Sequence, residues 1–89
     1  MKVYVVNIYL LVNDDSFQVA QTAFGKKEAA IVYMEKRHGM TRKSNTEWWG
    51  QETERHSRLE ANLSVMDIDE FFEKSFEKYF NTTYVAEEE

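Results

Sequence analysis

Residues 3–12 read VYVVNIYLLV and decide the fold. The stretch is dense in β-branched and aromatic side chains, and its even positions are all apolar, which is the pattern of one complete strand face. Its odd positions are apolar except for Asn7. We therefore predict a strand that is covered on both faces or lies near the centre of its sheet. The run lacks a signal-peptide cleavage site and is shorter than the roughly 20 residues of a membrane span.

A hairpin and a helix are expected next. The polar turn NDDS at residues 13–16 suits a hairpin because short polar side chains bond their own backbone, so a second strand is predicted over residues 17–23. Residues 26–38 are rich in Lys, Glu and Ala and precede Gly39, a residue that fits the left-handed cap of a helix. The pattern predicts a helix over residues 26–38.

The middle of the chain gives weaker patterns. No hydrophobic period holds over residues 40–56, where a short extra strand is expected around Trp48 and Trp49. Residues 57–66 fit both strand alternation and helical i, i+4, i+7 spacing, and four alternating matches against three helical ones favour the strand.

The last helix carries the strongest pattern. Asp67 and Glu70 have the spacing of a capping box, and the helix is expected to end near Asn81. One stripe of this helix is apolar or small: Ile68, Phe71, Phe72, Ser75, Phe76, Tyr79 and Phe80.

These elements, in the order ββαβα, predict an α+β fold: a small antiparallel sheet of three or four strands with two helices packed on it. Residues 1–81 are expected to form a single domain, and residues 82–89 an acidic, frayed C-terminal tail. Cysteine is absent, so neither a disulfide nor a thiolate metal site can brace the chain, and a reducing cytoplasm is the expected location.

The opening VYVV strand, the KKEAAIVYMEK helix and the strand that ends in VMDID also carry a resemblance. Together they resemble small uncharacterised proteins encoded by phages and prophages, over residues 3–69. The resemblance implies no activity. It implies a genetic context in which short acidic proteins inhibit or redirect a host protein.

Catalytic and metal chemistry have few candidate residues. Only His38 and His56 supply imidazoles, and three scattered glycines cannot form a phosphate-binding loop. Asp67 and Asp69 are better explained as helix-start residues than as an acid/base pair. We therefore expect no enzyme, no catalytic residues, no cofactor and no metal site.

Charge is segregated within the net charge of −5, and two groups of side chains are candidates for interaction. Residues 26–58 carry eight basic and five acidic residues, whereas residues 59–89 carry two basic and nine acidic ones. The first group lies in the long loop: Arg42, Lys43, Trp48, Trp49, Arg55, His56 and Arg58. The second group is the acidic side of the last helix: Glu70, Glu73 and Glu77.

Adjacent residues of an extended segment point to opposite sides, so one tryptophan is expected in the core and the other at the surface. The exposed one, flanked by Arg42 and Arg55, is the best candidate for a binding anchor. Which of Trp48 and Trp49 is buried stays open at this point.

The predicted function is a non-enzymatic protein–protein interaction module, a phage-type inhibitor or modulator of a host or cellular protein. The alternative is a single-stranded nucleic-acid-binding module that uses residues 26–58, which the net acidity of the chain disfavours. A membrane partner is not expected, because the polar face of the last helix alternates in sign. The aromatic stripe of that helix is expected to cover the sheet, with the seam of a homodimer as the alternative.

Overall fold

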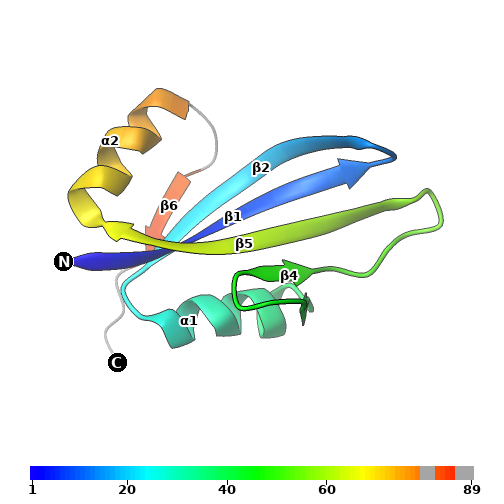
Figure 1. Cartoon of the computed structure of the whole chain (residues 1–89), viewed down its shortest axis with the longest axis horizontal. Helices are drawn as coiled ribbons and strands as arrows, with labels where there is room; N and C mark the ends of the chain where they lie inside the picture. Colours follow the sequence, from blue (N-terminus) through cyan, green and yellow to red (C-terminus); the bar gives the residue numbers. More distant parts are fainter. Residues whose placement is uncertain (79–81, 86–89) are drawn as a thin grey trace.

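The computed structural model describes residues 1–78 and 82–85, with the side chains of residues 1–73. One sheet of six strands has the order β3-β4-β5-β1-β2-β6 (Figure 1). The long strands are β1 (Lys2–Val12), β2 (Asp15–Phe24) and β5 (Ser57–Asp67). The short strands are β3 (Thr41–Arg42), β4 (Glu47–Trp49) and β6 (Thr82–Val85). The helices are α1 (Lys27–Val32), a π-type turn that continues it (Tyr33–Arg37), and α2 (Ile68–Lys78).

Strand β1 is central, as its two apolar faces predict. It pairs antiparallel with β2 on one side and along its full length with β5 on the other. The β1–β2 hairpin turns at Asn13, whose φ of 58° is the left-handed geometry that Asn tolerates. Residues 57–66, ambiguous by pattern, belong to β5, which confirms the strand prediction.

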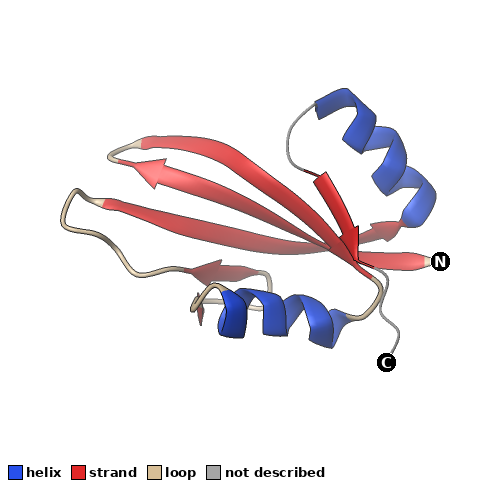
Figure 2. Ribbon diagram, turned by 180° about the vertical axis from the view of Figure 1, so that it is seen from behind, coloured by secondary structure: helices blue, strands red, loops and turns tan. Residues whose placement is uncertain are grey.

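The two helices cover opposite faces of the sheet (Figure 2). On the α1 face, even-numbered β1 side chains pack with the helix; the buried residues are Val6, Ile8, Phe24, Ala30, Met34, Met40, Trp48, Ala61 and Leu63. On the α2 face the buried cluster is smaller: Val3, Val5, Ala23 and Phe71. Among the described side chains, those of α2 therefore cover the end of its face near the N-terminus, and we call the remainder, toward the β1–β2 turn, the open face.

An amide network marks where the α2-covered region ends and the open face begins. Asn7 Oδ1 accepts hydrogen bonds from the side-chain amides of Gln18 and Gln21, both at 2.8 Å. Asn7 Nδ2 donates to Asn62 Oδ1 at 3.3 Å, which links β1 to β5. The one polar residue of the apolar run 3–12 is thus satisfied by both neighbouring strands.

The predicted sheet of three or four strands with two helices packed on it is wrong. The structure is dominated by its sheet: five strands pair antiparallel, β6 joins β2 in parallel, and the helices are short. Strands β3 and β4 hold only two and three residues, too few for a hydrophobic period to show in the sequence. The expected extra strand at the two tryptophans is confirmed as β4.

The C-terminal prediction also needs correction. Residues 82–85 are expected in a frayed tail from the sequence, but they form β6. This strand follows α2 in the chain and pairs with β2 at the edge of the sheet. Residues 86–89 lie outside the described part of the chain, as do Tyr79 and Phe80 of the predicted apolar stripe. Within that stripe Phe71 is buried, whereas Phe72 is 43% exposed.

The first helix matches the predicted range of residues 26–38 to within one residue at each end, as α-helix over Lys27–Val32 and as the π-type turn over Tyr33–Arg37. Its α-helical part ends at Val32, and the π-type turn closes with the His38 N–H donating to the Tyr33 carbonyl at 3.2 Å. Gly39 follows with a φ of 66°, so the predicted left-handed termination is confirmed. Neither helix, as far as the structure describes them, has the length and apolar character to cross a membrane.

Candidate functional site

The two tryptophans of β4 point to opposite faces of the sheet, as predicted. Trp48 is fully buried on the α1 face, opposite Ala61 of β5. Its indole Nε1 donates to Glu35 Oε2 at 2.9 Å, so the polar edge of the buried ring has a partner. Trp49 lies on the open face opposite Glu60, and is half-buried rather than fully exposed.

Cations surround the Trp49 ring. The guanidinium carbon of Arg58 lies 4.0 Å from the ring centroid, and Lys43 Nζ lies 5.2 Å from it. Both distances fall within the range of cation–π attraction. The predicted flanking residues were Arg42 and Arg55, and that part of the prediction is wrong. Arg42 lies one residue nearer the N-terminus than Lys43, so it falls on the other face, with its guanidinium carbon 5.4 Å from the centroid of the Trp48 ring.

Arg58 is fixed in place by Glu60. Its Nε and Nη2 donate to Glu60 Oε2 at 2.9 and 2.6 Å, and the two side chains are only 25% and 24% exposed. Because alternate residues of a strand share a face, β5 presents both to Trp49. We call Lys43, Trp49, Arg58 and Glu60 the Trp49 platform.

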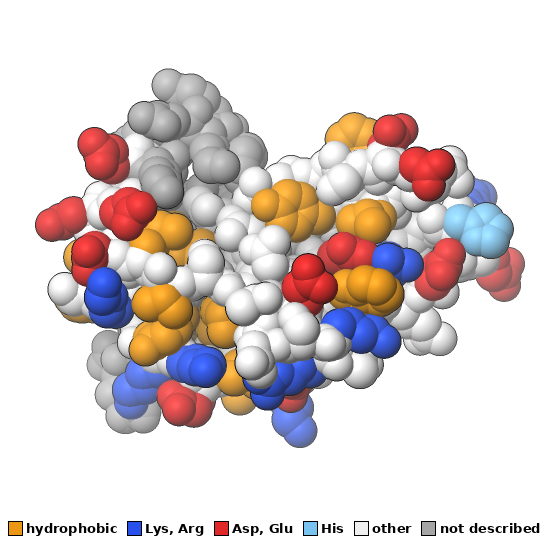
Figure 3. Space-filling view, viewed as in Figure 1, with side chains coloured by type: hydrophobic (Ala, Val, Ile, Leu, Met, Phe, Trp, Pro, Cys, Tyr) orange, Lys and Arg blue, Asp and Glu red, His pale blue; other side chains and the backbone are white. Residues whose placement is uncertain are grey.

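The open face continues from the platform onto β1. Tyr9 is the register partner of Glu60, and Leu11 is the partner of Arg58, so both lie beside the platform and both are half-buried. Figure 3 shows hydrophobic side chains among charges of both signs over β4 and the adjoining half of β5. The result is a mixed aromatic, apolar and charged surface of the kind that forms protein interfaces.

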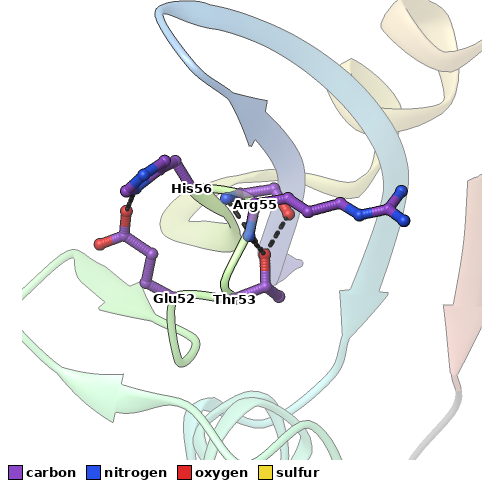
Figure 4. A network of polar contacts seen from close by, with 5 residues as sticks. Glu52, Thr53, Arg55 and His56 are labelled. Carbon is purple, nitrogen blue, oxygen red and sulfur yellow. Dashed lines mark hydrogen bonds and ion pairs between the residues drawn. The ribbon is translucent and has the colours of Figure 1, made fainter.

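Arg55 and His56 lie instead at the tip of the β4–β5 loop (Figure 4). Thr53 organises this tip: its Oγ1 accepts from the Arg55 N–H at 3.3 Å, and its carbonyl accepts from the His56 N–H at 3.1 Å. His56 has a φ of 59°, and its Nδ1 lies 3.3 Å from Glu52 Oε2. The imidazole is 77% exposed, so His56 is not a buried base beside a carboxylate.

The other predicted residues do not join the platform. Glu70 and Glu73 are exposed on α2, which lies apart from β4 (Figure 1), and the Glu77 side chain lies outside the described residues. His38 follows the π-type turn, where its ring packs against Tyr33 at 4.7 Å. Partial desolvation of this largely exposed ring, and secondarily the charge of Arg37, hold the pKa of His38 below its ordinary value.

Sequence reasoning missed Glu60, Tyr9 and Leu11 as parts of the site. The alternation of residues 57–66 places Arg58 and Glu60 on one face, but only the strand pairing brings that face to Trp49 and Tyr9. Among the described residues, no three His, Asp or Glu side chains cluster in a way that could hold a metal ion. Comparisons with family models, with curated proteins and with solved structures found no match.

Proposed function

We propose that this chain is a non-enzymatic protein-binding module and that the Trp49 platform is the centre of its binding surface. The observation that carries the proposal is the Trp49 ring with two cations beside it, on a sheet face that the described side chains of α2 cover at its far end. Trp, Tyr and Arg are the residues most enriched among the energetic anchors of protein interfaces. Here all three types lie side by side on two long strands and β4.

Preorganisation supports the same function. The Arg58–Glu60 pair fixes the guanidinium against the ring, so little side-chain entropy remains to be lost when a partner binds. The platform also presents both signs of charge, through Lys43 and Glu60, which allows a protein partner to be aligned by complementary charges. The resemblance to small phage-encoded proteins supports a host protein as that partner and inhibition or modulation as the outcome.

One observation favours a second candidate, single-stranded nucleic acid. A base could stack on Trp49 while Lys43 or Arg58 contacts a phosphate, and such stacking contributes about 1 to 3 kcal/mol per base. Against this, the Arg58 guanidinium is already bound to Glu60, and the chain carries a net charge of −5. Nucleic-acid binding draws most of its affinity from unpaired cations on phosphates, so the protein partner is the better supported choice.

A capture experiment in nuclease-treated extract of the source organism tests the proposal. Immobilised wild-type protein should retain a partner that Trp49→Ala loses by about tenfold or more, the scale expected for an interface anchor. The matched control is Val65→Ala, which truncates an apolar side chain that is 54% exposed on the α1 face. A partner retained equally by all three proteins would refute the platform as the binding surface.

The nucleic-acid candidate is tested separately with a labelled oligothymidylate at about 50 mM salt, where phosphate contacts are strongest. Binding that Trp49→Ala abolishes, together with no protein partner in the capture experiment, would replace the protein-binding proposal. Absence of oligonucleotide binding by the wild type would eliminate this second candidate.

A further inference from the structure

A second surface lies beside α1, away from the Trp49 platform. An open groove of about 820 Å³ runs along the helix next to the end of β2. Its apolar lining comes from Phe24, Ala29, Val32 and Tyr33. Val32 is 53% exposed, although an apolar side chain at a helix surface gains nothing from contact with water.

The rim of this groove is basic. Lys26, Lys36 and Arg37 line it, and Glu28 is the one acidic residue among its described lining residues. This local excess of positive charge occurs in a chain whose net charge is −5. Lys36 and Arg37 are both exposed and lie in the last turn of the π-type segment, where cations are also favoured by the helix dipole.

The floor of the groove is rigidly supported. The Tyr33 ring packs against Phe24 at 5.0 Å and against His38 at 4.7 Å between ring centroids. The π-type turn is anchored by Met34, which is fully buried and whose carbonyl accepts from the Met40 N–H at 3.0 Å. The apolar floor and the two cations of the turn are therefore present before any ligand binds.

We infer that this groove binds an acidic peptide segment of a partner protein, with one apolar side chain of the peptide seated over Val32, Phe24 and Tyr33. Carboxylates on either side of that side chain meet Lys36 and Arg37, and the Arg37 guanidinium can hold a carboxylate through two hydrogen bonds. The occupant is a peptide because the groove is open and its lining follows α1 and the π-type turn, and because its charge excess complements acids that flank an apolar anchor. An anionic bilayer would extend past the rim to the acidic remainder of the surface, which repels it.

The groove and the Trp49 platform are independent. Trp49 lies on the open face, whereas the groove is built from α1, its π-type turn and the end of β2. Trp49→Ala is therefore expected to leave peptide binding unchanged. Failure of the groove proposal and failure of the proposed function can be told apart by this variant.

Fluorescence anisotropy with the labelled peptide Glu-Asp-Leu-Phe-Glu-Asp tests the inference on the full chain. The wild type should bind the peptide, and binding should weaken in about 500 mM salt because the rim contacts are screened. Lys36→Glu combined with Arg37→Glu should raise the Kd by about tenfold or more, since two attractive contacts become repulsive. Lys27→Glu is the control: it reverses one charge in α1, outside the groove lining, and should have a much smaller effect.

A second variant and a second probe separate the apolar contact from charge. Val32→Ser should weaken binding several-fold without altering charge, and a peptide with Ala in place of Leu and Phe should bind more weakly still. Equal losses for Lys27→Glu and for the double variant would overturn the inference, as would tighter binding to anionic vesicles than to the peptide. Stronger peptide binding after Glu87, Glu88 and Glu89 are changed to Gln would also overturn it, because the occupant would then be this chain's own acidic end.

Discussion

Phe71→Ala should remove most of the free energy that holds α2 on the sheet. Phe71 is 1% exposed and is the α2 side chain that completes the buried cluster with Val3, Val5 and Ala23. Its neighbour Phe72, with ring centroids 5.4 Å apart, is 43% exposed and serves as a matched control. The two substitutions remove the same atoms from adjacent positions of one helix.

The expected magnitudes differ because the two rings differ in burial. Truncating a fully buried Phe costs about 3 to 5 kcal/mol, as transfer and cavity terms add. Phe72 keeps nearly half of its surface in water and leaves no enclosed cavity, so Phe72→Ala should cost about 1 kcal/mol. A chain of 89 residues is expected to have a free energy of unfolding of about 4 to 13 kcal/mol, so Phe71→Ala should remove a large share of it.

Urea titrations followed by tryptophan fluorescence and by circular dichroism measure this difference. With an m value of about 1 kcal/mol/M for a small domain, the midpoints of the two variants should differ by about 2 M or more. Trp48 lies on the opposite face, so coincident transitions by the two probes would show that loss of the α2 contact lowers the stability of the entire sheet. Equal midpoints for the two variants would refute the packing of α2 described above.

Other predictions address the α1 face and its helix. Trp49→Phe should keep a blue-shifted fluorescence emission that iodide does not quench, because Trp48 remains buried. Trp48→Phe should leave a red-shifted emission from Trp49 that iodide quenches. Protected emission from both variants would contradict the placement of Trp49. Glu35→Ala should cost about 1.5 to 3 kcal/mol in urea unfolding, because it leaves the buried indole N–H of Trp48 without its charged acceptor, and an effect below about 0.5 kcal/mol would show that the bond is unimportant. The lowered pKa of His38 means that the unfolded chain binds the proton more tightly than the folded one, so the free energy of unfolding should fall as the pH drops from about 7.5 through the ordinary histidine pKa near 6.5 and below. His38→Gln should reduce this pH dependence, and an unchanged dependence would show that His38 is not the group responsible. Gly39→Ala should cost about 1 kcal/mol by thermal unfolding, since the φ of 66° is strained for any side chain although nothing lies within 4 Å of the added carbon, and an unchanged midpoint would show that the turn relaxes at no cost.

The sequence predicted those parts of the fold that depend on local periodicity. Two apolar faces on residues 3–12 placed β1 at the centre, and alternation over residues 57–66 favoured β5. Strand β6 could not be predicted in this way, because its parallel pairing with β2 depends on where α2 directs the chain. Amino-acid composition and the spacing of apolar residues do not indicate which strand edge β6 will join.

The sequence likewise predicted only those parts of the candidate site that depend on local strand alternation. Strand alternation separated Trp48 from Trp49, but it could not say which one faces the core, since that depends on the register of β4 against β5. The same register, rather than proximity in sequence, selects Lys43 and Arg58 over Arg42 and Arg55 as neighbours of Trp49. The α1 groove is lined by the π-type turn and by Phe24 of β2. These belong to different elements, and no sequence pattern links them; the fold brings them together.

The Asn7 amide has a consequence for how the three long strands align. Since β1 is apolar on both faces, hydrophobic burial alone distinguishes poorly between neighbouring alignments of β1 and β5. A shift of two residues keeps the faces but would place Asn7 opposite Ser64 or Glu60 instead of Asn62, and a partly buried amide that loses its partners destabilises the shifted alignment. Gln18 and Gln21 impose the same condition on β2, so one polar side chain selects a single alignment for all three strands. Replacing Asn7 with Val would add apolar burial to the sheet while removing the interaction that makes its strand alignment unique.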